Sequence, residues 1–408
     1  MQKNWQVGAL FGIPLFIDRS WFLILILITS LDANDATVRS LVNTEVLAWL
    51  TGFGMALLLF LSVLLHELGH SLVAQSQGIE VKSITLFLFG GIASIERESQ
   101  NPLDAFAVAI AGPLVSLSLF AVGWVVSFNT PEISLVHFFA KDISQINLVL
   151  ALFNLIPGLP LDGGQMFKAI VWKWTGDRFR GIRYAAASGK FLGTSAVVLG
   201  LVAILLAGEL GGLWVALVGW FILRNANAYE RLTDLQNVLM SLTAENVMSR
   251  DFRVVDAHLS LREFADQYVL DQQTKMKVIF ASSEGRYRGL IRPTALQSIE
   301  RSLWETMELI DIALPLSEIP SVAQDVHVAD IICKLEELEE NFITVLSPAG
   351  AVAGIVDRGN IVQAIAKEYT IEIPAAELTR IRTDRVYPSG FPLVDIAKQL
   401  KSETGEAR

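Results

Sequence analysis

The sequence predicts a polytopic α-helical membrane protein with six transmembrane helices, followed by a cytoplasmic α/β module. Two observations predict this class. Apolar residues make up 52% of the 408 residues and charged residues only 18%, yet nearly all the long uncharged runs lie before residue 225. After residue 240, two similar units follow one another, each of about 60 residues, and internal repeats of this length pack on each other.

The predicted spans are uncharged runs of roughly bilayer length. Residues 5–17 are interrupted by Gly8, Gly12 and Pro14, which predicts a short strand or an interfacial segment instead of a span. The six spans are 20–31, 46–65, 105–131, 143–161, 191–208 and 210–223, and the second continues as helix toward Gln77. The first and the last are short for a bilayer.

The distribution of basic residues predicts the orientation of the spans, because loops rich in Lys and Arg stay in the cytoplasm. The connections after the second and fourth spans are basic, whereas 32–45 and 127–135 carry only Arg39 between them. The basic residues are Lys82, Arg97, Lys168, Lys173, Arg178, Arg180, Arg183 and Lys190. Both termini and the α/β module are therefore expected in the cytoplasm.

The second span runs directly into His66-Glu67-Leu68-Gly69-His70. Two histidines four residues apart lie on one helix face and can bind one metal ion, and the glutamate between them can accept a proton from water. The alternative is a pair of surface histidines at a helix end. Ionisable residues at membrane depth are costly and mark function, and a catalytic zinc requires a third protein ligand.

Asp162 is the predicted third ligand. His66 comes 20 residues after residue 46 and Asp162 comes 19 after residue 143, so both are expected roughly 30 Å down spans that run in the same direction. The segment 154–164 contains two prolines and three glycines that break a helix, and such backbone at membrane depth requires protein or a water-filled cavity around it. The alternative is a capping aspartate at the membrane surface.

These two motifs together resemble the site-2 protease family of intramembrane zinc metalloproteases. The resemblance covers most of residues 5–225 and includes Ser20-Trp21-Phe22, Phe89-Gly90-Gly91, Ala111-Gly112-Pro113 and Asn154…Pro157…Leu161-Asp162-Gly163. It implies one zinc ion held by His66, His70 and Asp162, with Glu67 as the catalytic base. It also implies that Asn154 holds the substrate backbone or the developing oxyanion. The family often has proline where Gly158 or Leu159 stands, which affects the shape of the loop.

The predicted function is hydrolysis of peptide bonds within or near the transmembrane segments of other membrane proteins. Single-span proteins such as membrane-anchored transcription regulators are the expected substrates. The alternatives are an ion transporter with an incidental metal motif and an inactive scaffold. Few charged residues line the spans, which disfavours a transporter, and the intact set of His66, Glu67, His70, Asn154 and Asp162 disfavours a scaffold.

Residues 83–95 between the second and third spans have the pattern of two strands around Gly90-Gly91. An exposed strand edge can pair with an unwound substrate segment. A structural hairpin without substrate contact is the alternative, and the sequence does not separate the two.

The repeat after the membrane spans resembles a tandem pair of cystathionine-β-synthase (CBS) domains, which commonly bind adenine nucleotides between the units. The predicted organisation is 1–225 membrane protease, 226–240 linker, 241–305 first unit, 306–371 second unit and 372–408 tail. The family's Ser or Thr and its ribose-binding Asp are replaced by Arg292 and Ala295 in the first unit and by Asp357 and Asn360 in the second. Nucleotide binding and a purely structural or homodimerising role both stay open.

Several classes of protein and site are disfavoured by composition. The net charge of −10 argues against a nucleic-acid partner, which requires clustered Lys and Arg. The single cysteine, Cys333, excludes an internal disulfide and lies in a helical apolar pattern typical of a core thiol. His137, His258 and His327 are predicted not to be metal ligands.

Overall fold

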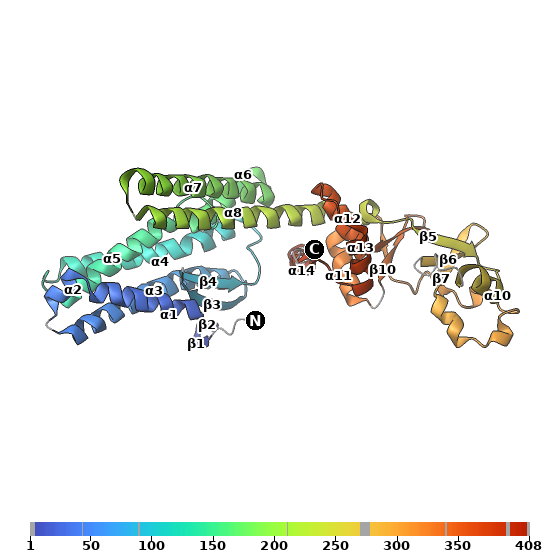
Figure 1. Ribbon diagram of the computed structural model, residues 1–408, viewed down its shortest axis with the longest axis horizontal. Coiled ribbons are helices and arrows are strands. Elements are labelled where there is room, and N and C mark those ends of the chain that lie inside the picture. Colours follow the sequence, from blue (N-terminus) through green and yellow to red (C-terminus); the bar gives the residue numbers. More distant parts are fainter. Residues whose placement is uncertain are drawn as a thin grey trace. The chain divides into compact units, whose positions relative to one another are not determined.

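The computed structural model describes residues 5–42, 44–88, 90–209, 211–269, 278–338, 341–388 and 392–405, with the side chains of 269 and 402–405 left aside. The chain forms two compact units, Met1–Thr233 and Asp234–Arg408 (Figure 1). The metal motif lies in the first unit and the repeat in the second, so each unit is described by itself.

The first unit begins with a four-stranded sheet. Its strands are β1 (Trp5–Leu10), β2 (Ile13–Ile17), β3 (Val81–Phe87) and β4 (Gly90–Ile95), hydrogen-bonded in that order. Only the β2–β3 pair is parallel. Residues 5–17 thus form strands, as their interrupted apolar pattern predicts, and β4 is an edge strand of the sheet as described. Phe89 lies outside the described residues.

Eight helices are described in the first unit. They are α1 (Arg19–Ala33), α2 (Ala36–Leu41), α3 (Glu45–Ser76), α4 (Pro102–Phe128), α5 (Leu135–Asn154), α6 (Asp162–Thr175), α7 (Arg178–Ala207) and α8 (Gly211–Ser241), the last of which continues into the second unit. Among the described residues, α3, α4, α5 and α7 are long and apolar enough to cross a membrane. The predicted count of six spans is therefore supported for four.

The predicted bounds of the fourth span, 143–161, are wrong at both ends. Helix α5 begins at Leu135, where Ser134 caps its N-terminus, and ends at Asn154. Pro157 and Pro160 lack the backbone N–H that a continuing helix requires, so the chain turns and starts α6 at Asp162. The twenty residues of α5 span about 30 Å, which brings Asn154, and not Asp162, to the end of the helix.

The last two spans also differ from their predicted bounds. The predicted fifth span, 191–208, is the second part of α7, which begins at Arg178 behind the capping carboxylate of Asp177. The basic residues assigned to a connection therefore lie on α6 and on the first turns of α7. The predicted sixth span and the predicted linker 226–240 belong to one continuous helix, α8. Leu210, the first residue of that predicted span, lies outside the described residues.

Glycines set the close packing of α7 against α8. A Cβ added at Gly193 would lie 2.8 Å from the Gly219 carbonyl oxygen, and one at Gly200 would lie 2.5 Å from that of Gly212. Contacts this short leave no room for a side chain, so the two backbones touch at both levels.

The second unit contains the predicted repeat as two sheets of the same topology. In the first, β5 (Phe252–Asp256) is parallel to β6 (Val278–Ser283), which is antiparallel to β7 (Arg286–Ile291). In the second, β9 (Ser321–Ala323) is parallel to β10 (Phe342–Leu346), which is antiparallel to β11 (Val352–Asp357). The repeat found in the sequence is thus present in the backbone hydrogen bonding.

The helices of the two repeats are less alike than their strands. The second repeat has α11 (Val328–Glu337) and α12 (Arg358–Glu368), whereas the first has α9 (Ala244–Val247), α10 (Leu261–Phe264) and a π turn (Ala265–Val269). The helix expected after β7 is replaced by 3₁₀ turns, Pro293–Ser298, Arg301–Leu303 and Leu309–Asp311. The sequence pattern of each unit, strand, helix, strand, strand and helix, predicts a regular helix after β7, and this prediction is wrong.

The leading segments of the two repeats are exchanged. Strand β8 (Leu314–Pro315), assigned from sequence to the second repeat, pairs with β7 of the first. Ser249, at the start of the first repeat, bridges to Ile355 on β11 of the second. Each sheet therefore depends on a segment that belongs in sequence to the other repeat.

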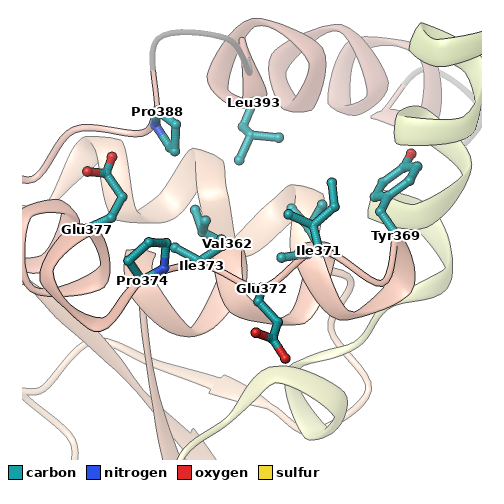
Figure 2. Close-up of a pocket in the computed structure, with 11 residues that line it drawn as sticks. Val362, Tyr369, Ile371, Glu372, Ile373, Pro374, Glu377, Pro388 and Leu393 are labelled. Carbon is teal, nitrogen blue, oxygen red and sulfur yellow. The ribbon is translucent and has the colours of Figure 1, made fainter.

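The C-terminal helices α13 (Ala375–Asp384) and α14 (Leu393–Gly405) complete this unit. Leu393 and Ile396 are buried in the core that also contains Cys333, whereas Val386 is exposed. An apolar cavity of about 250 Å³ lies between α12, the 369–374 segment and the start of α14. Figure 2 shows Val362, Ile373 and Leu393 around it, with Glu372 and Glu377 at its margin.

Candidate metal centre

Helix α3 presents the first two members of the centre. His66 and His70 lie four residues apart on one face, and only 3% and 8% of their surfaces are exposed. Their Nε2 atoms are 3.3 Å apart. Two buried imidazoles therefore direct the same ring nitrogen toward one point.

Helix α4 fixes the opposite nitrogens of both rings. His70 Nδ1 donates to the Val108 carbonyl oxygen at 2.7 Å, and His66 Nδ1 lies 2.9 Å from Ser116 Oγ. A carbonyl oxygen accepts only, so Nδ1 of His70 carries the hydrogen and a neutral ring keeps an unprotonated Nε2. Partners of this kind orient the imidazoles that ligate metals.

Asp162, the first residue of α6, adds a carboxylate oxygen to the same point. Its Oδ2 lies 3.0 Å from His66 Nε2 and 3.3 Å from His70 Nε2. The non-helical segment 155–161, and not the end of a transmembrane helix, places the Asp162 side chain beside the two histidines. In the described part of the chain, this is the one group of three or more His, Cys, Asp or Glu side chains close enough to hold a metal.

The residues fit a zinc ion. The unprotonated Nε2 of His70 lies 3.3 Å from Nε2 of His66, and a shared cation would account for two imidazoles and a carboxylate that converge on one point. Ligands about 2.0–2.1 Å from a tetrahedral zinc lie about 3.3 Å from one another, close to the three distances observed. A Cβ added at Gly112 would lie 2.2 Å from His70 Nε2, so the glycine leaves the space open.

Glu67 lies against the edge strand β4. A Cβ added at Gly91 would lie 2.5 Å from Glu67 Cγ, so only glycine allows the strand to approach this closely. The same added Cβ would lie 3.4 Å from Glu67 Oε1, so the carboxylate itself is next to this strand. The carboxylate is therefore held between the metal-binding face of α3 and the edge of the sheet.

Asn154 reaches the centre from the last residue of α5. Its Nδ2 lies 3.4 Å from His66 Nε2. An amide N–H donor thus stands beside the point on which the imidazoles and the carboxylate converge. All five residues singled out from sequence are brought together here by α3, α5 and α6.

Sequence reasoning missed the contribution of α4. Val108, Gly112 and Ser116 lie four residues apart, on one face, opposite two histidines that are also four apart. Gly112 entered the prediction only as part of a family motif, and Gly91 likewise. The four-residue period of small or polar residues in an apolar helix was the available indication.

Two of the three remaining histidines have other partners. His137 Nδ1 lies 2.9 Å from the Ser127 carbonyl oxygen, and His258 Nδ1 lies 2.7 Å from a carboxylate oxygen of Glu308. This hydrogen bond raises the pKa of His258 above its usual value. Neither belongs to a described cluster of metal-ligating side chains.

The positions at which CBS domains contact a nucleotide are engaged within the protein. Asp357 and Asn360 form the capping box of α12, with Asn360 N–H donating to Asp357 Oδ1 at 2.7 Å. Arg382 Nε also donates to Asp357 Oδ2 at 2.9 Å. These contacts account for both side chains in structural terms and leave nucleotide binding an open prediction.

Comparison with known proteins gives matches for both halves of the chain. The model of peptidase family M50 matches residues 54–144 and 128–199. A provisionally named zinc metalloprotease of Synechocystis sp. (sll0528) is 38% identical over 369 residues, which are 90% of this chain and 96% of the relative.

Solved structures are similar to a smaller share of the chain than the Synechocystis relative. The site-2 protease from Methanocaldococcus jannaschii is 31% identical, covers 56% of this chain and 96% of its own, and has a TM-score of 0.40. A CBS domain-containing protein of unknown function from Bacillus anthracis is 17% identical, covers 33% of this chain and 99% of its own, and has a TM-score of 0.28.

Proposed function

The chain belongs to peptidase family M50, the site-2 protease family, and on this premise we propose that His66, His70 and Asp162 hold its zinc and that Glu67 is the general base. The protein is an intramembrane zinc metalloprotease. The observation that supports the residue assignment best is the convergence of two Nε2 atoms and one carboxylate oxygen within 4.8 Å of one another. Family membership disfavours the alternative of an ion transporter.

The bound ion supplies Lewis acidity, which acidifies water and polarises a carbonyl group. Glu67 accepts a proton from the attacking water and returns it to the amine that leaves, so that a C–O bond forms as the peptide C–N bond breaks. Strand β4, packed against the Glu67 side chain at Gly91, limits the movement of the carboxylate. Asn154 donates from Nδ2 to the carbonyl oxygen of the substrate, where negative charge develops.

The edge of β4 is the proposed binding site for the unwound substrate. It lies next to Glu67, and its Ile92 side chain is 57% exposed. A strand added at this edge would be held by backbone hydrogen bonds, beside the base that must reach its peptide group. Strand β3, considered from sequence, lies inside the sheet between β2 and β4 and is not free to pair.

The family acts on membrane proteins, and we place single-span proteins, such as membrane-anchored transcription regulators, as the substrates. The basic residues of α6 and of the first turns of α7 support cytoplasmic termini. The repeat in the second unit supports a CBS pair with a regulatory or homodimerising role, joined to the membrane unit by α8.

Two variants test the assignment of the centre. Glu67→Gln is expected to keep one zinc per chain and to lose about 10²–10⁴-fold in cleavage of a reconstituted single-span substrate, because the proton acceptor is removed. His70→Ala is expected to lose both zinc and cleavage. Zinc content measured beside turnover separates these results, and a Glu67→Gln protein that still cuts would remove Glu67 from the mechanism.

A proline tests the strand edge. Ile92→Pro removes one backbone N–H of β4, whereas the control Ile92→Ala removes only the side chain. Cleavage by Ile92→Pro should be slower than by Ile92→Ala at unchanged zinc content. Equal rates for the two variants would count against pairing at this edge.

A further inference from the structure

The segment 155–161 contributes no proposed ligand, yet it determines where Asp162 lies. It joins the end of α5 to the first residue of α6. Its Leu159 side chain is fully buried among Ile182, Ala185 and Ala186 of α7. The segment therefore rests on a helix that supplies no residue to the metal centre.

Two hydrogen bonds attach the backbone of this segment to α7. Leu159 N–H donates to the Ala185 carbonyl oxygen at 3.2 Å. Ser188 Oγ donates to the Pro157 carbonyl oxygen. Ser188 lies three residues after Ala185, so both bonds come from the same turn of α7.

Gly189 brings the two backbones into direct contact at that turn. A Cβ added at Gly189 would lie 2.2 Å from the Leu159 carbonyl oxygen. A Cβ added at Gly158 would in turn lie 2.8 Å from Gly189 Cα. A side chain at position 189 can be accommodated only if the segment moves away from α7.

Close backbone packing continues from this segment to Asp162, the proposed ligand. A Cβ added at Gly164 would lie 2.3 Å from the Gly158 carbonyl carbon, and one at Gly163 would lie 2.2 Å from the Leu155 carbonyl oxygen. The first turn of α6 is thus packed on the same segment that α7 holds. A displacement of the segment at Leu159 is passed to Asp162, three residues further on.

We propose that Ser188 and Gly189 are positioning residues for Asp162, so that the affinity of the centre for zinc depends on α7. This inference rests on the proposed assignment of Asp162 as third ligand. Supporting groups of this kind change metal affinity by about 10–100-fold when removed. The substitution Ser188→Ala loses one hydrogen bond, whereas Gly189→Ala displaces the backbone and has the larger effect.

The test uses the full-length protein in detergent and measures zinc affinity by competition with a chelator. Ser188→Ala is expected to bind zinc about 10-fold more weakly and Gly189→Ala about 100-fold more weakly. Ser188→Thr keeps the hydroxyl and should restore wild-type affinity. Gly193→Ala is the matched control, since its Cβ meets the Gly219 carbonyl oxygen of α8 at 2.8 Å and not the segment.

The visible spectra of the cobalt-substituted proteins are a second measurement, which a general loss of packing between helices does not change. The visible bands of Co²⁺ report coordination geometry, so the Gly189→Ala spectrum should move toward that of Asp162→Ala, while Gly193→Ala keeps the wild-type spectrum. Wild-type affinity and spectrum in both Ser188→Ala and Gly189→Ala would overturn the proposal. If Asp162→Ala itself bound zinc like the wild type, the ligand assignment would fall, whatever α7 does.

Discussion

The two units differ in which side chains lie at the surface and which lie inside. In the membrane unit, large apolar side chains face outward, Leu206 of α7 being 84% exposed, while imidazoles and a carboxylate gather inside. In the second unit the described cavity is lined by apolar side chains, and its two carboxylates, Glu372 and Glu377, stand at the margin.

This difference determines what a polar residue indicates in each unit. A charged or ionisable group inside a bilayer protein is costly and is retained for function. The same group on a water-exposed α/β unit is ordinary surface. The rarity of polar residues therefore leads to the site in the first unit and leads to nothing comparable in the second.

The strongest way to test the comparison is to place one methyl group in each unit. Gly112→Ala puts a Cβ 2.2 Å from His70 Nε2, where the metal must bind. We expect zinc affinity to fall by more than about 100-fold, beyond the loss of a supporting group. Zinc per chain after dialysis against a chelator is the measurement.

Gly289→Ala is the matched substitution in the second unit. Its Cβ would lie 2.4 Å from the Leu314 carbonyl oxygen and would separate β8 from β7. It should loosen the exchanged strand and leave zinc content unchanged. Loss of zinc in this variant as well would mean that the centre depends on the second unit.

Truncation of a buried side chain in the second unit tests the same contrast through its effect on the stability of each unit. Phe264 is fully buried in the core of the first repeat, so Phe264→Ala should cost that repeat about 3–5 kcal/mol. Hydrogen exchange of the full-length protein should show faster opening of β5 and β6, with α3 and α4 unaffected. Equally slow hydrogen exchange of β5 and β6 in the wild type and in Phe264→Ala would contradict this account of the core.

The pairing of His66 with His70 on one helix face and the repeat could be predicted from the sequence because each depends on local spacing. His66 and His70 share a face by helical period, and the two repeats share a strand pattern. The end of α5 at Asn154 could not be placed, because an apolar run continues to Leu161 and only the turn around Pro157 ends the helix. The exchange of β8 was also missed, since strand pairing is set by tertiary contacts.

The contribution of α4 was missed, although the four-residue period of its small or polar residues indicated it, and Ser116→Ala measures this contribution. Removing the partner of His66 Nδ1 frees the ring to rotate, so zinc affinity should fall by about 10–100-fold. Ser118→Ala is the control, because its hydroxyl donates to Leu114 of its own helix. Equal affinity of the two variants would show that α4 only packs against the histidines.

The smallest expected effect concerns a polar cluster of the membrane unit that lies outside the metal centre. Glu98 accepts from Lys168 at 2.9 Å and from Arg178 at 3.1 Å, and these cations lower the pKa of Glu98 to about 2. A folded-state pKa below the ordinary value stabilises the protein above about pH 4.5, and this contribution is lost as the pH falls toward 2. Because the carboxylate is partly exposed, we expect at most about 1 kcal/mol.

The thermal unfolding midpoint in detergent, followed from about pH 6 to about pH 2, measures this contribution. The wild type should lose more stability on acidification than Glu98→Gln, and the two curves should converge at the acidic end. Parallel curves would refute the assigned ion pairs. Zinc content should be the same in both proteins at neutral pH. If Glu98→Gln released zinc, polar groups throughout the membrane unit would have to be treated as parts of one site, and the contrast between a single centre and its surroundings would fail.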